Sequence, residues 1–512
     1  MSSSDPTVIH PLLVQRVAGV LLHPTSLPSF GGAFGIGDVG PTARRFVDWA
    51  ASAGLRRWQM LPIGPVGEGE SPYSARSSFA IEPMLTSVAD LAEDGYLPTS
   101  AVRLKRNETV QDDRGRASWR RVRGWKQPRL EAAFQKFQTR RGRMGLRGMA
   151  YADFRTRQAA WLDDWCRYQT SRTSKHRSGN TPECDPMYHA FVQFVLDRQW
   201  SRLQQHAHER ELRLIGDLPF FCAPDSADVT SRPDLFRLDE SGHPTLLTGI
   251  PPASDPDDIT NSVWGDAAVH QGQLWGHPHY NWAAHQKEHW AWWRDRVCTP
   301  LERFDLIRID HFYGFLKVFE IPRGTTDLRN GSWQSTPGDE LLAALKGKLG
   351  RLPCFAEDLG ERPPQMQQLC DRYGLVGMRM LQTAFFGTAE AESDLPHNHP
   401  PLCVVYPGCH DNDTVAGWYR DLDTETRRRF AHYAGPSAAS DPAGTMARLA
   451  YTSPAHTAIV QMQDFLGLNR RARMNRPGNP TGNWCWRMRR SDTPSSLARR
   501  LEMLASATQR LG

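Results

Sequence analysis

Acidic residues close several short apolar runs of this sequence, and Asp310 is the most informative of them. It ends the run 304–310, a pattern typical of a buried strand with charge at its end. Because side chains alternate along a strand, Arg308 and Asp310 are expected on the same side. A fixed cation keeps a neighbouring carboxylate ionised at neutral pH, as a nucleophile requires. A structural ion pair would leave the same pattern, so this pair alone does not indicate catalysis.

Two further acids follow apolar runs in the same way. Glu357 ends the next run along the chain, and Asp411 follows a later one. Neighbouring strands lie ~4.8 Å apart, and retaining glycosidases hold their two carboxyl groups ~5–5.5 Å apart. If Asp310 and Glu357 end adjacent strands, their spacing favours a retaining glycosidase mechanism.

The surroundings of the acids indicate different roles. The apolar neighbour Ala356 predicts a raised pKa for Glu357, which suits a general acid that later acts as a base. Asp411, together with His410, is expected to hold sugar hydroxyls and favour a distorted ring, with Asp413 as the alternative residue for that role.

Other acids have less specific interpretations. Asp217 ends an earlier run and would either bond to substrate or hold neighbouring strand ends together. Asp358 is expected to point away from Glu357 and to be structural. The acids lie on separate predicted strands, without a His-x-x-x-His helix or a Ca²⁺-loop pattern, so we predict no metal site.

The elements that would position these acids alternate between strands and helices. Eight apolar runs are predicted as strands: 18–23, 56–62, 212–219, 305–310, 353–358, 377–382, 403–411 and 458–464. Helices are predicted between several of them, at 42–53, 187–210, 285–296, 338–349, 364–373 and 424–434. This alternation predicts an α/β fold, a (β/α)₈ TIM barrel, with catalytic groups at the carboxyl ends of the strands. An open doubly wound sheet is the alternative, although the sequence has no nucleotide-binding glycine motif.

The uneven spacing of these strands predicts inserted segments. We expect one catalytic barrel domain over residues 1–512, with a mainly helical, basic insertion at about 66–185. A second insertion, at about 220–300, is rich in Asp, Pro, Gly and Trp and is predicted to line the cleft as loops.

The charge of the chain is unevenly distributed. Residues 101–150 contain 15 Lys and Arg against 4 Asp and Glu, within a chain of net charge +6. Basic segments can bind nucleic acid, but Leu130, Phe134 and Phe137 recur here at near-helical spacing. We therefore predict a packed subdomain with a solvated basic face, and no nucleic-acid partner.

The remaining composition is that of a cytoplasmic protein. Its 9 Cys are scattered without a C-x-x-C pair, which argues against a disulfide framework. Residues 1–6 lack the charged start and apolar stretch of a signal peptide, and the early apolar stretch 17–22 is too short to span a membrane. We expect no membrane partner, and a monomer or weak homo-oligomer.

Motifs in the same order along the chain resemble the amylomaltases, the 4-α-glucanotransferases (disproportionating enzymes) of glycoside hydrolase family 77. They extend from residue 16 to about residue 488 and include His-Pro-Thr-Ser-Leu-Pro from His23, Ser-Pro-Tyr-Ser from Ser71, Gly-Asp-Leu-Pro from Gly216, Gly-Gln-Leu-Trp-Gly from Gly272, Arg-Ile-Asp-His-Phe from Arg308, Ala-Glu-Asp-Leu-Gly from Ala356, His-Asp-Asn-Asp-Thr from His410 and Ala-Arg-Met-Asn from Ala472.

The resemblance implies transfer of part of an α-1,4-glucan to the 4-hydroxyl of another sugar, by a retaining mechanism in a (β/α)₈ barrel. It implies Asp310 as nucleophile, Glu357 as general acid/base and Asp411 as transition-state stabiliser. The residues implied for the donor subsites are Arg308, His410, Asp217, Tyr73 and Trp275. The expected substrates are malto-oligosaccharides, amylose and glycogen-derived glucans, without any cofactor or metal.

The sequence also departs from the family pattern. Tyr313 stands where the family usually has Arg, Thr230 where it has Trp, and Glu82 and His277 where Asn is frequent. The loop 253–271 is longer and more acidic than the family's and is expected to border the acceptor side of the cleft. These departures leave acceptor choice and chain length open, while all three carboxylates remain. A retaining α-1,4-glucan hydrolase of the α-amylase clan is the alternative, since it differs only in whether water or a sugar reaches the glucosyl-enzyme. A non-catalytic glucan-binding protein would require damage to the carboxylates.

Overall fold

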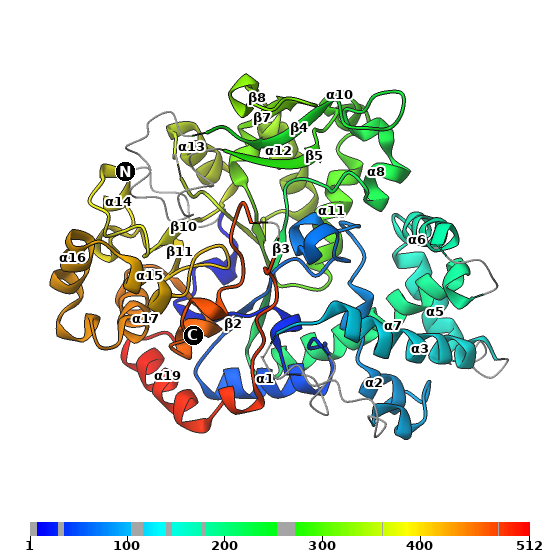
Figure 1. Cartoon of the computed structure of the whole chain (residues 1–512), viewed down its shortest axis with the longest axis horizontal. Helices are drawn as coiled ribbons and strands as arrows, with labels where there is room; N and C mark the ends of the chain where they lie inside the picture. The colour runs from blue at the N-terminus through cyan, green and yellow to red at the C-terminus, as the bar shows by residue number, and fades with distance from the viewer. Residues whose placement is uncertain are drawn as a thin grey trace.

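Eight parallel strands form the centre of the molecule, in a computed structural model that describes residues 8–28, 35–103, 116–139, 146–176, 181–252, 272–360, 362–479 and 481–512 (Figure 1). The strands are β1 (Val17–Leu21), β2 (Arg57–Gln59), β3 (Arg213–Leu218), β6 (Leu306–Ile309), β9 (Cys354–Ala356), β10 (Gly377–Met380), β11 (Cys403–Tyr406) and β12 (Thr457–Gln461). Each overlaps one of the eight predicted runs, although β1 and β12 begin one residue earlier than predicted. The predicted loop 253–271 lies outside the described residues, so its role stays a prediction.

The sheet nearly closes on itself. Its strand order is β10-β11-β12-β1-β2-β3-β6-β9, and the first and last strands are joined where the Ala356 N–H donates to the Val376 carbonyl at 2.9 Å. A parallel bridge between Phe355 and Val376 completes this contact. The predicted barrel is therefore confirmed, and the open doubly wound sheet is excluded.

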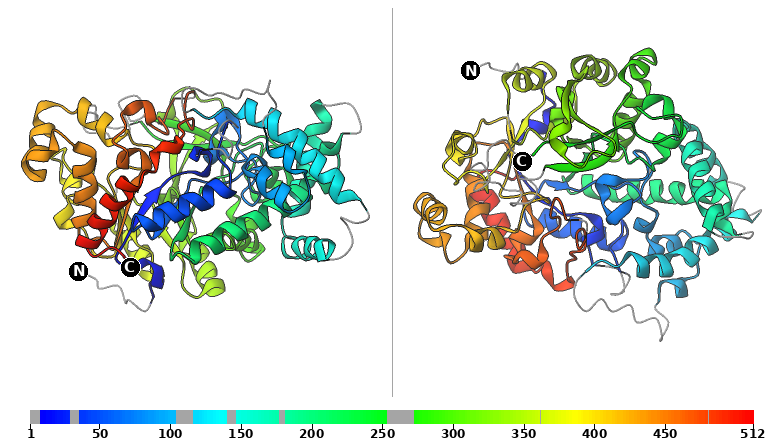
Figure 2. Two further views of the ribbon diagram at one scale, coloured as in Figure 1. Left: turned by 90° about the horizontal axis from the view of Figure 1, so that it is seen from below. Right: turned by 45° about the horizontal axis from the view of Figure 1, so that its top comes forward.

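Helices surround the barrel in the order that the sequence predicted (Figures 1 and 2). They are α1 (Pro41–Ser52), α7 (Pro186–His208), α10 (Trp282–Lys287), α11 (Ala291–Leu301), α12 (Gly338–Leu349), α13 (Pro364–Tyr373), α15 (Val415–Asp421), α16 (Thr424–Ala434), α17 (Pro442–Thr452) and α19 (Ser495–Ala507). Short helices α8 (Ala227–Ser231), α14 (Ala389–Glu392) and α18 (Met462–Phe465) lie in the connections. Helices α12, α13 and α16 have the predicted bounds.

One helix prediction was wrong. The segment 285–296 is not continuous, because α10 ends at Lys287 and α11 begins at Ala291. Between them His289 and Trp290 have φ angles of 53° and 62°, in the left-handed region that breaks an α-helix. The hydrophobic spacing continues across this break, which is why the sequence pattern did not reveal it.

A helical layer, formed by the part of the chain that connects β2 to β3, lies beside the barrel (Figure 2). It contains α2 (Val88–Glu93), α3 (Trp119–Gln138), α5 (Leu146–Arg157) and α6 (Leu162–His176). Leu130, Phe134 and Phe137 of α3 are at most 1% exposed, and the Phe137 ring stacks on Phe191 of α7 at 4.8 Å. These aromatic contacts pack the helical layer against the rest of the molecule.

A second sheet, of four antiparallel strands, was not predicted. Its order is β5 (Gln273–Pro278), β4 (Leu246–Ile250), β7 (Lys317–Pro322) and β8 (Ser332–Ser335). β4 and β5 belong to the segment expected as loops, and β7 and β8 connect β6 to β9. All of β8 is exposed, so it lacks the apolar alternation by which a strand is recognised in sequence.

Candidate active site

A single buried arginine joins the acids at the mouth of the barrel. Arg308 Nη1 lies 2.7 Å from Asp217 Oδ2 and 2.9 Å from Asp310 Oδ1, while Nη2 lies 3.5 Å from Glu357 Oε2. β3 pairs Asp217 directly with Arg308, so the two side chains meet inside the barrel. Although burial opposes charge, the carboxylates of Asp217 and Glu357 hold the pKa of Arg308 well above its usual value.

The alternation predicted for the strand before Asp310 is observed. Ile307 and Ile309 pack in the large core cluster between strands and helices, whereas Leu306 packs in a separate cluster with Ile215 of β3. Arg308 shares the side of Leu306 and therefore points into the barrel. The alternating pattern of this strand is what places a guanidinium under the acids.

The pKa values of the two neighbouring carboxyl groups differ. Burial raises the pKa of Asp310 to about 6, with Arg308 acting in the opposite direction. Burial raises the pKa of Glu357 to about 8, also against Arg308. At neutral pH the arrangement favours an ionised Asp310 and a protonated Glu357.

A backbone amide also holds Glu357. The N–H of His311 donates to Glu357 Oε2 at 2.5 Å, and His311 adopts a left-handed conformation with φ of 49°. The turn after Asp310 thus directs this amide towards the neighbouring strand. The Asp310 and Glu357 side chains remain 24% and 16% exposed, so both stay accessible to solvent.

Asp411 lies in a polar environment supplied by a distant segment. Its Oδ2 is 3.3 Å from His410 Nε2, and its Oδ1 accepts from the Asn475 amide at 2.5 Å. Arg473 Nη2 donates to the Asp411 carbonyl at 2.6 Å. Burial alone would raise the pKa of Asp411, but the charge and hydrogen bond of His410, with that of Asn475, lower it to about 2.

Aromatic side chains line the site on two sides. The Tyr73 ring stacks on His410 with centroids 5.0 Å apart, and its hydroxyl donates to Asp217 Oδ2 at 2.8 Å. Trp484 packs 5.8 Å from the Tyr73 ring. On the other side, Trp275 meets the His311 ring edge-on at 4.9 Å.

The structure brings all eight predicted site residues to this end of the barrel, linked by the contacts above. It separates Asp413 from them, because Asp413 Oδ2 is paired with Arg470 at 2.8 Å. Asp358 accepts the Met378 N–H at 2.6 Å, a structural contact. The sequence predicted no role for Arg473, Asn475 or Trp484. The Ala-Arg-Met-Asn motif contains Arg473 and Asn475, whereas no motif marks Trp484.

Comparison with known proteins identifies the family. A family model described as 4-alpha-glucanotransferase, glycoside hydrolase family 77, matches residues 22–183 and 171–493. The chain belongs to this 4-alpha-glucanotransferase family.

Its relatives match nearly from end to end. The 4-alpha-glucanotransferase of Thermus thermophilus is 37% identical, covering 97% of this chain and 99% of its own. The 4-alpha-glucanotransferase of Synechocystis sp. is 36% identical, and the match covers 93% of this chain and 94% of the relative. An amylomaltase from Streptococcus agalactiae, solved in complex with acarbose, superposes with a TM-score of 0.87 at 29% identity, over 97% of this chain and 100% of that one.

Family membership confirms the predicted resemblance and the prediction of a glucanotransferase, and it does not favour the hydrolase alternative. Among the helices that the structure describes, none combines the length and apolar character needed to cross a bilayer.

A group of three potential metal ligands occurs in the described part of the chain. Atoms of Cys409, His410 and Asp411 lie within 4.8 Å of one another. Burial raises the pKa of the Cys409 thiol to about 12, so the thiolate that a metal prefers is disfavoured. Asp411 is already bonded to His410 and Asn475. These contacts disfavour a metal centre at this group.

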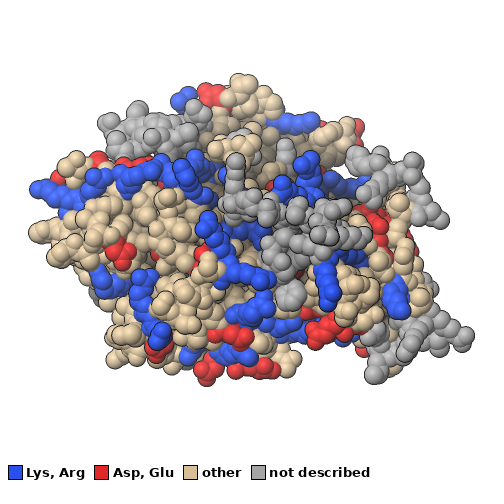
Figure 3. Space-filling model, turned by 60° about the horizontal axis from the view of Figure 1, so that its bottom comes forward, with Lys and Arg blue, Asp and Glu red and all other residues tan. Residues whose placement is uncertain are grey.

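Basic residues of the segment 101–150 partly serve internal packing. The Arg129 guanidinium lies 3.9 Å from the Trp125 ring centroid, and buried Lys126 lies 3.2 Å from Asp38. On the face drawn in Figure 3, Lys and Arg are interleaved with acidic and uncharged side chains. The absence of a nucleic-acid partner stays a prediction.

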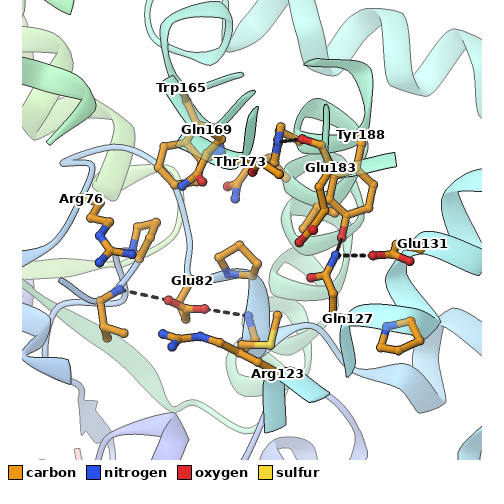
Figure 4. A pocket seen from close by; sticks show the side chains of 18 of the residues that line it. Arg76, Glu82, Arg123, Gln127, Glu131, Trp165, Gln169, Thr173, Glu183 and Tyr188 are labelled. Carbon is orange, nitrogen blue, oxygen red and sulfur yellow. Dashed lines mark hydrogen bonds between the residues drawn. The ribbon is translucent and has the colours of Figure 1, made fainter. Parts of the chain in front are cut away.

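A cavity of about 570 Å³ lies apart from Asp310, Glu357 and Asp411, between the inserted helices (Figure 4). Glu82 lines this cavity, and its carboxylate accepts hydrogen bonds from the N–H groups of Val66 and Met84 at 3.0 and 2.9 Å. On its wall Gln127 donates to Glu131 and to Tyr188. None of the eight predicted site residues lines this cavity.

Proposed function

We propose that this protein transfers a segment of an α-1,4-glucan to the 4-hydroxyl of an acceptor glucose or oligosaccharide, by double displacement through a covalent glucosyl-enzyme. The observation that supports this proposal most directly is the contact of Arg308 with both Asp310 and Glu357. The two acids differ in pKa, at about 6 for Asp310 and about 8 for Glu357. This arrangement supports a nucleophile beside a protonated acid.

In the first displacement, an Asp310 oxygen attacks the anomeric carbon of the donor as the glycosidic bond breaks. Glu357 gives its proton to the departing oxygen, which leaves as the 4-hydroxyl of the released sugar. The products are a glucosyl ester on Asp310 and an ionised Glu357. The amide of His311 and the guanidinium of Arg308 are placed to stabilise that new charge.

In the second displacement, Glu357 takes the proton of an acceptor 4-hydroxyl, whose oxygen attacks the anomeric carbon. The bond to Asp310 breaks and restores its carboxylate. Two inversions retain the configuration, and the acid again carries its proton.

The remaining site residues would bind the donor sugar. Asp411 stays ionised and would stabilise the positive charge of the transition state while holding sugar hydroxyls with His410. Tyr73, Asp217 and Trp275 would complete the donor subsites through stacking and hydrogen bonds. Malto-oligosaccharides, amylose and glycogen-derived glucans fit this chemistry.

The expected setting of the reaction is the cytoplasm, with the protein a monomer or weak homo-oligomer. The 9 cysteines support this location, because they are free, as in reducing compartments. The proposal involves neither a membrane partner nor nucleic acid.

The test is product analysis with maltotriose as the sole substrate. Transfer yields glucose and a ladder of longer oligosaccharides, whereas products no longer than maltose would show hydrolysis instead. Asp310→Asn is expected to lower the rate by about 10³-fold or more while oligosaccharide binding persists. Asp239→Asn, which removes an exposed carboxylate, is the matched control. Unchanged turnover by Asp310→Asn would refute the assignment.

A further inference from the structure

An exposed tryptophan lies on the connection between the two strands that carry Asp310 and Glu357. β7 and β8 form a hairpin within this connection, and Trp333 of β8 is 38% exposed. Its ring lies 5.5 Å from that of Tyr313 at 72°, and 5.2 Å from that of Phe319 at 60°. Phe319 is buried, whereas Trp333 is exposed and Tyr313 is half-buried.

The hairpin is anchored to the segment that follows Asp310. Tyr313 belongs to η10 (Phe312–Phe315), which begins two residues after Asp310. The Thr336 hydroxyl donates to the Gly314 carbonyl at 2.8 Å, and the Thr336 N–H donates to Leu316 at 3.0 Å. The aromatic pair is therefore held in a fixed relation to the proposed nucleophile.

A lysine and neutral polar groups surround the pair. Lys317 Nζ lies 5.1 Å from the Tyr313 centroid and 4.7 Å from the Trp333 centroid, within cation–π range of both rings. Ser335 of β8 is also exposed and shares the face of Trp333, because side chains alternate along a strand, whereas Ser332 and Gln334 point to the opposite face. A flat apolar ring bordered by hydroxyl and ammonium groups matches a sugar ring, which has apolar faces and hydroxyl edges.

The opposite edge of the same sheet belongs to the site already described. Trp275 lies on β5 and contacts His311, whereas Trp333 lies on β8 and contacts Tyr313. Three strand spacings separate these edges, or ~14 Å. The sheet thus extends from a predicted donor-subsite residue, Trp275, to the exposed pair.

We propose that Trp333, Tyr313 and Lys317 form a remote glucan-binding platform, which holds sugar units of a long α-1,4-glucan that lie beyond the catalytic subsites. The platform rests on the proposed function for its ligand. A protein partner fits less well, because specific interfaces need ~800 Å² on each side and this pair is small and bordered by polar groups.

The test compares a long substrate with a short one. For Trp333→Ala we expect KM for amylose to rise ~3–10-fold, the loss of roughly one stacking contact, with kcat retained. The fold-increase in KM should be at least three times larger with amylose than with maltotriose. Tyr433→Ala removes a ring of similar exposure, 37%, and should show no such difference. Equal effects on both substrates, or none, would overturn the platform.

A binding measurement separates the platform from the catalytic proposal. In an Asp310→Asn background, calorimetry with amylose should show ~3–10-fold weaker binding when Trp333→Ala is added, and Trp333→Phe should recover most of it. Undiminished binding would contradict the platform even if transfer is confirmed. If wild-type protein fails to disproportionate maltotriose, the proposed function fails, while a Trp333-dependent affinity for amylose would still support the platform.

Discussion

Asn475 donates its side-chain amide to Asp411 Oδ1 at 2.5 Å, across 64 residues of sequence. The Asn475 N–H also donates to the His410 carbonyl at 3.0 Å, so one residue holds both His410 and Asp411 in place. We infer that Asn475 orients Asp411 towards the sugar and helps keep it ionised.

Removing this amide should affect catalysis more than binding. For Asn475→Ala we expect kcat to fall ~10-fold or more with a smaller change in KM, because Asp411 would lose a bond that holds it for the transition state. Asn475→Asp should be worse, since a second carboxylate would raise the pKa of Asp411. Steady-state kinetics with maltotriose measure both. A pure KM effect would instead indicate that Asn475 binds substrate.

The pH dependence should follow the two neighbouring acids. Asp310 must be ionised to attack, so kcat/KM should rise with pH through about 6, the pKa that burial gives it. Glu357 must be protonated, so kcat/KM should fall through about 8, where burial places its pKa. We expect a bell-shaped profile with its maximum between these values.

The profile has an internal control. Glu357→Gln should abolish most activity. With a donor whose leaving group needs no proton, the variant should retain some activity, and the pH profile of that activity should lack the descending limb. A profile that is flat between pH 6 and 8, or one that keeps its descending limb in this variant, would contradict the assignment of Glu357.

Arg308 should not tolerate replacement by lysine. The two terminal nitrogens of the guanidinium contact three carboxyl groups, whereas an ammonium is a single point charge. We expect Arg308→Lys to lower kcat/KM by ~10²-fold, and Arg308→Met by more, because Asp310 would then lose its counter-charge. If Arg308→Lys retained full activity, the multiple contacts of the guanidinium would be unimportant.

Arg510 should govern stability without affecting chemistry. Its buried guanidinium donates to six backbone carbonyls, those of Val17, Ala450, Tyr451, Ser453, Ala455 and His456. Arg510→Ala would leave buried acceptors without donors, at a cost of roughly 3 kcal/mol or more. We expect a lower thermal unfolding temperature and an unchanged KM below it. Arg499→Ala, at an exposed position of α19, is the matched control.

The barrel and the acids were predictable because both depend on local pattern. Most barrel strands lie in short, largely apolar runs, and Asp310 and Glu357 directly follow two of them. The contact between Asn475 and Asp411 depends on how the chain returns after β12, which no local pattern encodes. β8 escaped prediction for a different reason, since an exposed edge strand such as Ser332–Ser335 needs no buried face.

The pairing of β1 with β12 has a consequence for how this protein folds. Val17 is matched with Thr457, and Arg510 then bonds to carbonyls on both sides of this seam, at Val17 and His456. Contacts between segments so far apart in sequence form slowly and late. During synthesis one edge of β1 therefore remains unpaired until β12 has been made. An unpaired strand edge favours aggregation, so the nascent chain is most prone to aggregate at this stage.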